Sequence, residues 1–164
     1  MTRTRSVILL MLVWTPGLWA QAGSLSPADY RAIEQLYARN TMAFDSAEQR
    51  GEAFAATFTA DGVFVSPAGS ASGRKALAAV AAKNVPGLHQ WVSNLLIESA
   101  PNGASGLAYV VRANVSASGE ITEGGMYRDD LVKTPDGWRF KRRVYAPGHR
   151  MPAPIPVPPG RPVR

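Results

Sequence analysis

The side chains that could do chemistry in this sequence are carboxylates, tyrosines, amides and two histidines, His89 and His149. The chain contains no cysteine, so disulfides, thiolate metal sites and a cysteine nucleophile are excluded. Two histidines are too few for a multi-histidine metal site. Imidazole is the one side chain here whose ordinary pKa allows proton transfer in both directions near neutrality. Proton transfer by a carboxylate and a histidine is therefore the chemistry that this composition favours.

Asp45 is the first candidate for such chemistry. It follows an apolar helical face, and it is a polar exception at the far end of that face. A carboxylate shielded by Tyr37, Phe44 and Phe54 would have its pKa raised by desolvation, toward that of a useful base. The alternative is a polar residue at a helix C-terminus that caps the following turn together with Ser46.

A β-rich run over residues 89–98 carries three further candidates. His89 at its start either moves a proton or faces solvent. Trp91 shares a face with His89, and either forms a stacking wall of a cavity or belongs to a dimer face. A regular pleat puts Asn94 on the opposite face from His89, whereas a bulge between them would bring both inward.

Tyr127 and Asp129 share a face of a later strand, so both should point the same way. Tyr127 either donates a hydrogen bond to a carbonyl or developing enolate, or serves as apolar lining. Asp129 is expected to form a cross-strand ion pair with Arg143 rather than to act as a catalytic acid. His149 is expected on the surface.

Helical and strand patterns place these residues in an α+β domain. Ser26, Pro27 and Asp29 predict a helix start, with serine as the N-cap and proline at the first helical position. Helices packed on one concave face of a curved antiparallel sheet would leave a cone-shaped cavity for a ligand, with Trp138 and Phe140 in the core. The expected elements are a helix from residue 27, helices at 49–59 and 74–83, a glycine- and serine-rich loop at 67–73, and strands at 63–65, 89–98, 106–115, 120–133 and 138–146.

The two ends of the chain differ from the middle. A basic start, an apolar stretch over 7–14 and the sequence Ala20-Gln21-Ala22 predict a secretory signal, with an uncleaved anchor or a buried helix as alternatives. We expect export to a periplasm or the medium, without a stable membrane anchor. The proline-rich end predicts an extended tail, either passive or a ligand of proline-recognition domains. The expected organisation is a signal peptide at 1–22, a domain at 23–148 and a tail at 149–164.

Charge is unevenly distributed. The formal net charge is +6, yet residues 23–138 hold nine basic and twelve acidic residues, a net of −3. The basic excess lies from Arg139 onward, where it has no interleaved stacking aromatics. We therefore expect a solvated basic edge and no nucleic-acid binding, with contact to an anionic lipid or polymer as the alternative.

Several short motifs occur together in a characteristic order. They are Ile33-x-x-Leu36-Tyr37, Phe58-Thr-Ala-Asp61-Gly62-Val63-Phe64, Gly73-Arg74-Lys75-Ala76-Leu77, His89-x-x-x-x-Asn94, and Tyr127-x-Asp129 followed by Asp136-Gly137-Trp138-Arg139-Phe140 and Arg143. Over roughly residues 27–146 the sequence resembles the SnoaL-like branch of the NTF2-like superfamily, which includes scytalone dehydratases and ketosteroid isomerases. The resemblance implies a cone-shaped α+β barrel, usually a homodimer through the outer sheet face. It also implies a pocket open at one end and reactions that need no cofactor.

The resemblance also implies roles for individual residues. Asp45 corresponds to a pocket aspartate that orients a histidine or binds a water, and His89 corresponds to the pocket histidine. An Asp45–His89 hydrogen bond would set the histidine tautomer, and Tyr127 would reach into the pocket. The residues expected to bind the ligand are Tyr37, Asn40, Trp91 and Asn94.

Three residues differ from the family's catalytic residues, and these differences argue against steroid isomerase chemistry and against a dehydratase that uses two histidines. Ser66 occupies the position at which steroid isomerases have their catalytic base, and Asn40 occupies the position of their first-helix tyrosine. Asn114 or Val115 stands where scytalone-type dehydratases have a second histidine. Two functions remain under consideration. The first is a cofactor-independent lyase, isomerase or cyclase acting on a small apolar oxygenated compound. The alternative is a non-catalytic ligand-binding or protein-assembly domain.

Overall fold

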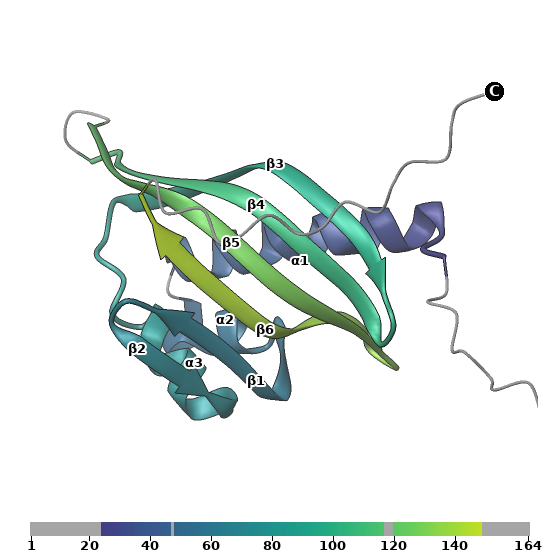
Figure 1. The fold of residues 1–164 in the computed structure, drawn as a ribbon. Coiled ribbons are helices and arrows are strands. Elements are labelled where there is room, and N and C mark those ends of the chain that lie inside the picture. The colour runs from purple at the N-terminus through teal and green to yellow at the C-terminus, as the bar shows by residue number, and fades with distance from the viewer. Residues whose placement is uncertain (1–23, 47, 117–119, 149–164) are drawn as a thin grey trace, which may run out of the picture.

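The computed structural model describes residues 24–46, 48–116 and 120–148 (Figure 1). The predicted signal peptide at 1–22 and the tail at 149–164, with His149, lie outside the described residues. These two assignments therefore stay predictions.

The first helix, α1 (Pro27–Ser46), begins where the sequence predicts. Ser26 is its N-cap: its hydroxyl accepts a hydrogen bond from the Asp29 N–H at 3.2 Å, and the Asp29 carboxylate accepts one from the Ser26 N–H at 3.1 Å. This reciprocal capping box satisfies two backbone donors that a helix start otherwise leaves free. Asp29 also accepts hydrogen bonds from Lys133 and Trp138, and so ties the start of α1 to the last β-hairpin of the described chain.

The segment after α1 departs from the prediction. The expected helix at 49–59 is a 3₁₀ helix, Glu48–Gly51, followed by the short helix α2 (Glu52–Ala55). Phe58 already belongs to strand β1 (Phe58–Ser66), and the expected loop at 67–73 contains strand β2 (Gly69–Ser72). Helix α3 (Gly73–Ala81) follows.

The remaining four strands lie where the sequence predicts, within a few residues. They are β3 (Leu88–Ala100), β4 (Gly103–Asn114), β5 (Glu120–Thr134) and β6 (Gly137–Pro147). All six strands form one sheet in the order β2-β1-β6-β5-β4-β3. The sheet is mixed rather than purely antiparallel, because β1 pairs with β6 in parallel. It is also open rather than a closed barrel, since β2 and β3 form its two ends.

Helix α1 covers one face of strands β3–β6, while β1, β2, α2 and α3 gather at one end of the sheet (Figure 1). We call the face toward α1 the inner face. The core on this face contains a group of large aromatic side chains, and Phe54, Phe58, Phe140 and Tyr37 are all at least 95% buried. Trp138 and Phe140 are in the core, as predicted. The space that would form a deep cone is therefore mostly filled.

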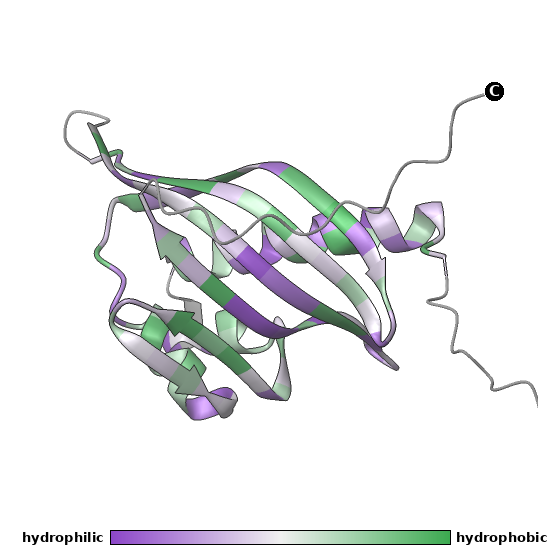
Figure 2. Ribbon diagram, in the orientation of Figure 1, coloured by the Kyte–Doolittle hydropathy of each residue, from purple (hydrophilic) through white to green (hydrophobic). Residues whose placement is uncertain are grey.

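A hydrophilic band crosses the middle of β5 and β6 (Figure 2). The register of these strands places two oppositely charged pairs side by side there, Asp129 with Arg143 and Asp130 with Arg142. Asp129 and Arg143 are buried, whereas Asp130 and Arg142 are exposed on the outer face. Within the part of the chain that the structure describes, no helix is long and apolar enough to cross a membrane.

Candidate functional site

The deep end of the inner face holds a buried polar network centred on Arg143. The Arg143 guanidinium donates to both carboxylate oxygens of Asp129, each at 2.8 Å, and to the side-chain oxygen of Asn40 at 2.5 Å. Tyr37 donates its hydroxyl proton to Asp129. Asn40 in turn donates to the Thr57 hydroxyl at 2.7 Å. The predicted Asp129–Arg143 ion pair is thus confirmed, and it lies in the core.

Aromatic rings enclose this guanidinium. Its central carbon lies 3.9 Å from the ring centroid of Phe140 and 4.1 Å from that of Tyr127. Gly106 lies on β4 directly beside Asp129 on β5. A Cβ at this position would come within 2.1 Å of the Tyr37 hydroxyl oxygen. Glycine at this position therefore lets Tyr37 reach Asp129. Tyr37 and Asn40 were expected to bind ligand, but in this structure their polar groups are used inside the core.

A cavity of about 290 Å³ remains on the inner face, between this network and α3; we call it the mouth pocket. Its size is at the lower end of small-molecule sites, roughly 300–1,000 Å³. Its walls combine apolar and polar side chains. They are Phe44, Phe64, Ser66, Pro67, Ala68, Val80, Gln90, Arg112, Glu123, Tyr127 and Tyr145.

Arg112 supplies the positive charge of the mouth pocket. One of its terminal nitrogens donates to Glu123 at 3.2 Å, and the other donates to the side-chain oxygen of Asn84 at 3.0 Å. The third guanidinium nitrogen, Nε, is buried and has no hydrogen-bond partner among the described residues. The guanidinium is therefore held in place by its two terminal nitrogens, while its Nε–H is unused within the described residues.

Asp45, at the end of α1, borders the mouth pocket through Gln90 and Arg112. Its Oδ2 accepts a hydrogen bond from the Gln90 backbone N–H at 2.9 Å. Its Oδ1 is buried and has no partner in the described part of the chain. Burial raises the Asp45 pKa above its ordinary value, and this outweighs the lowering by the Gln90 N–H, His89 and Arg112. The direction agrees with the prediction and favours a carboxyl group that exchanges protons nearer neutrality.

Two tyrosines stand on the other side of the mouth pocket. Tyr127 is buried, its hydroxyl lies 3.4 Å from the Gln90 side-chain oxygen, and burial raises its pKa. Tyr145 has a buried hydroxyl without a hydrogen bond of ordinary geometry among the described residues. Burial, and then the nearby Glu123 carboxylate, raise the pKa of Tyr145 well above its usual range. Both hydroxyls therefore stay protonated and able to donate near neutral pH.

His89 and Trp91 are placed differently from the family-based expectation. Both side chains are exposed, whereas the side chain between them, Gln90, is buried on the inner face. The expected Asp45–His89 hydrogen bond is absent among the described residues, so this part of the prediction is corrected. The physical reason is the alternation of a strand, because Gln90 facing inward turns His89 and Trp91 outward.

Asn94 is also exposed, although the predicted bulge is present. Asn94 has a left-handed backbone, with φ of 52°, and the β3–β4 register shifts between Ser93 and Leu96. The bulge restores the inward direction for Leu95 and Ile97, which pack against the core, rather than for Asn94. Asn94 therefore does not reach the mouth pocket.

Sequence reasoning missed four polar residues of the mouth pocket. Gln90, Arg112 and Glu123 are consecutive cross-strand neighbours in register on β3, β4 and β5, and Tyr145 pairs with Tyr127. The shared face of Tyr127 and Asp129 was predicted correctly, and extending it across the β5–β6 hairpin would have found Tyr145.

The described residues contain no cluster of three or more histidine, aspartate or glutamate side chains that could hold a metal ion.

Comparison with protein families agrees with this architecture. A model of the SnoaL-like domain matches residues 26–144. The chain therefore belongs to the SnoaL-like family, within the NTF2-like fold. No curated protein matches its sequence significantly.

Solved structures similar to this chain share the cystatin-like, or NTF2-like, fold. A protein of unknown function from Nostoc punctiforme is 23% identical, with a TM-score of 0.69 over 79% of this chain and 98% of that one. A protein of unknown function from Mycobacterium tuberculosis is 29% identical, with a TM-score of 0.67 over 74% and 77% of the two chains. A protein from Novosphingobium aromaticivorans, named as a candidate scytalone dehydratase, is 25% identical, with a TM-score of 0.62 over 74% and 85%.

Proposed function

We propose that the mouth pocket binds a small aromatic or alicyclic compound that carries a carbonyl oxygen, and moves a proton on it without a cofactor. Asp45 is the proton-transfer group. Arg112 and Tyr145 donate hydrogen bonds to the oxygen on which negative charge develops. Such proton transfer next to a carbonyl is the first step of many isomerisations, eliminations and cyclisations, so one site serves all three reaction types.

One observation carries this proposal. Three buried polar atoms at or beside this pocket form no hydrogen bond of ordinary geometry among the described residues: Asp45 Oδ1, Arg112 Nε and Tyr145 Oη. An unsatisfied buried polar group costs about 1–3 kcal/mol, so several of them in one place are expensive unless a ligand or water uses them. They comprise one acceptor and two donors, the set needed to remove a proton and stabilise an enolate.

The apolar walls support the same class of compound. Phe44, Phe64 and Val80 line the pocket, and they favour a flat or compact hydrocarbon skeleton. The name of the scytalone dehydratase candidate describes that neighbour's chemistry, and an aromatic oxygenated substrate is compatible with this pocket.

The direct test is exchange of the α-protons of 2-tetralone in deuterated buffer, followed by proton NMR. We expect the protein to accelerate exchange above the buffer rate. Asp45→Asn should reduce the acceleration by about 10²- to 10⁴-fold, which is the usual contribution of a positioned acid–base group. Tyr145→Phe should reduce it by a smaller factor and should change the stability little, because this hydroxyl forms no hydrogen bond of ordinary geometry among the described residues.

His89→Ala is the matched control, because His89 is exposed and only adjusts the charge around Asp45. It should keep most of the acceleration. If Asp45→Asn and wild type exchange the ketone protons at the same rate, Asp45 is not the proton-transfer group.

A non-catalytic ligand-binding domain is the second candidate. It is favoured by the buried Arg143–Asp129 network, which fills the deep end of the cone and leaves a small cavity. In that case 2-tetralone should bind, and Arg112→Gln should weaken it, but no variant should alter an exchange rate equal to that of buffer.

We also propose that the outer sheet face pairs with a second copy of the chain. Trp91, Leu96 and Tyr109 leave 50%, 46% and 42% of their surface exposed, and their strand register places all three on that face. Exposed apolar patches of this kind are typical of interfaces. Light scattering on wild type and Tyr109→Lys tests this, because the charged variant should shift a dimer toward monomer.

A further inference from the structure

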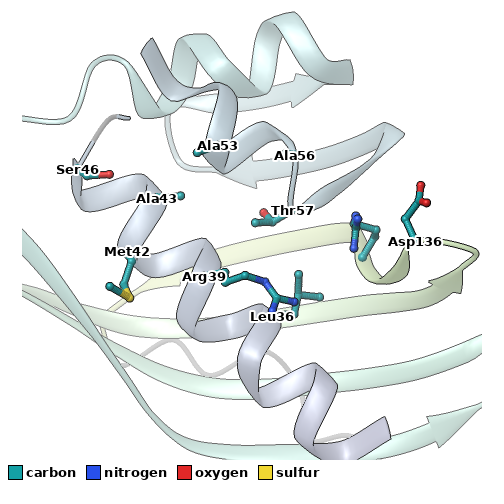
Figure 3. A pocket seen from close by; sticks show the side chains of 10 residues that line it. Leu36, Arg39, Met42, Ala43, Ser46, Ala53, Ala56, Thr57 and Asp136 are labelled. Atoms are coloured by element: carbon teal, nitrogen blue, oxygen red, sulfur yellow. The ribbon is translucent and has the colours of Figure 1, made fainter. Parts of the chain in front are cut away.

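A second and larger groove lies on the other side of α1, away from the mouth pocket. Its volume is about 720 Å³, and it lies between α1, α2 and the β5–β6 hairpin (Figure 3). It is lined by Leu36, Arg39, Met42, Ala43, Ser46, Ala53, Ala56, Thr57, Asp136 and Arg139. Its size falls within the usual range of ligand sites, roughly 300–1,000 Å³.

Two arginines from different elements line this groove. Arg39 extends from α1 into the gap between α1 and the β5–β6 hairpin (Figure 3), and Arg139 belongs to β6. Among the described residues neither arginine forms an ion pair. Arg139 donates one hydrogen bond, to the Trp138 carbonyl at 2.9 Å. Asp136 at the hairpin turn is the one acidic residue among the lining side chains, and it forms no ion pair with either arginine.

The floor and opposite wall of the groove are apolar. Leu36 and Ala43 come from α1, and Ala53 and Ala56 come from the α2 region. Met42 is 71% exposed at the rim, and its flexible thioether can cover a chain-like ligand. The groove therefore combines apolar side chains with two arginines that form no ion pair within the described residues.

We propose that this groove binds an amphipathic carboxylate, in the manner of a medium-chain fatty acid. The carboxylate lies between Arg39 and Arg139, and the hydrocarbon chain lies along Leu36, Ala43 and Ala53. Arginine suits this role because its planar guanidinium presents paired donors to a carboxylate. A small inorganic anion would leave the apolar walls uncovered, and a neutral hydrocarbon would leave both arginines without a partner.

Calorimetric titration with decanoate tests the proposal on the chain without residues 1–22, the predicted signal peptide. The decanoate concentration stays below that at which micelles form. Decanol and acetate supply the tail alone and the head group alone. We expect decanoate to bind more tightly than either, and its affinity to fall with rising salt concentration, because both arginines are accessible to solvent. Equal binding of decanol and decanoate would overturn the role of the arginines.

Charge variants locate the binding site. Arg39→Gln and Arg139→Gln should each weaken decanoate binding about two- to fivefold, which is the effect of losing one solvent-accessible ion pair. Asp136→Asn should strengthen it about twofold, since it removes a like charge. Arg142→Gln is the matched control on the same strand, because Arg142 is exposed on the outer face and lies outside the groove.

A last variant separates the groove from the mouth pocket. Arg112→Gln should leave decanoate affinity unchanged if the fatty acid occupies the groove. If Arg112→Gln abolishes binding while Arg39→Gln and Arg139→Gln do not, the ligand belongs to the mouth pocket and the proposed groove site is wrong. Decanoate affinities that are equal in wild type, Arg39→Gln and Arg139→Gln would also overturn it.

Discussion

Arg143 and Asp129 face each other across β6 and β5, and their side chains are 1% and 0% exposed. Each charge therefore depends on the other for its solvation. The third guanidinium nitrogen donates a hydrogen bond to Asn40, and the carboxylate also accepts a hydrogen bond from Tyr37. The pair connects α1 to the sheet and occupies the depth of the fold.

Removing one partner of this pair should be far worse than removing both. Asp129→Leu should lower the free energy of unfolding by about 3–5 kcal/mol, because it leaves a buried guanidinium without a counter-charge. Adding Arg143→Met should recover part of that loss, since an apolar pair avoids the unpaired charge. Urea denaturation of both variants measures their free energies of unfolding.

The control is Asp130→Leu, which changes the exposed neighbour on the same strand and should cost less than about 0.5 kcal/mol. If the double variant is no more stable than Asp129→Leu, the ion pair is not what makes the single change costly. If Asp129→Leu does not fold at all while the double variant does, this result also supports the prediction.

Asp45 should make stability depend on pH. Its pKa is raised in the folded protein, so its contribution to stability is fully present below its ordinary value of 3.8. That contribution is lost as the pH rises through the folded-state pKa. Asp45→Asn does not ionise, so its melting temperature should improve relative to wild type as the pH rises from about 4 toward 7.

Asp61 provides a control of opposite sign. Its pKa is lowered by Lys141, which donates a hydrogen bond to it, so its ionised form is favoured in the folded state. Asp61→Asn should therefore lose stability relative to wild type over the same pH rise. A melting-temperature difference for Asp45→Asn that is flat or moves the same way as that of Asp61→Asn would contradict the assignment.

The bulge in β3 depends on a residue that accepts a left-handed backbone. Asn94→Ala should lower the free energy of unfolding by about 1 kcal/mol, because the alanine Cβ is sterically strained at a positive φ. Asn94→Gly should remain close to wild type, since glycine pays no such cost. Chemical denaturation, with Ser93→Ala as the neighbouring control, distinguishes a conformational requirement from a side-chain interaction.

The first 22 residues should direct export. Fused to a phosphatase that becomes active only outside the cytoplasm, residues 1–25 should give activity in a bacterial host, and mass spectrometry should find a mature N-terminus near Gly23. Replacing Arg3 and Arg5 with glutamate should reduce export. An unprocessed, inactive fusion would show that this segment is not a signal.

Local features of the fold were predictable from the sequence. The Ser26-Pro27-Ala28-Asp29 sequence is a self-contained helix start, and alternation along one strand correctly placed Tyr127 and Asp129 together. Strand β2 could not be found this way, because Gly-Ser-Ala-Ser has low β-propensity and becomes a strand by pairing with β1. The parallel pairing of β1 with β6 joins residues about 80 positions apart, which no local pattern encodes.

The candidate site was harder to predict because it depends on the phase of one strand. Reading β3 from His89 or from Gln90 exchanges its two faces, and hydrophobicity alone favours placing Trp91 inside. The structure places Trp91 outside and uses Gln90 to contact Asp45 and Tyr127. Only the packing of α1 against β3 decides between these alternatives.

Strand β3 is one of the two ends of the sheet, and this has a consequence for solubility. A long terminal strand is a template on which further chains can add without limit. The twist at Asn94 divides the 13 residues of β3 into two shorter pieces with different hydrogen-bonding phase. An incoming strand could follow one piece but not both, so the same residue that aims Leu95 at the core also discourages fibrous growth from this edge.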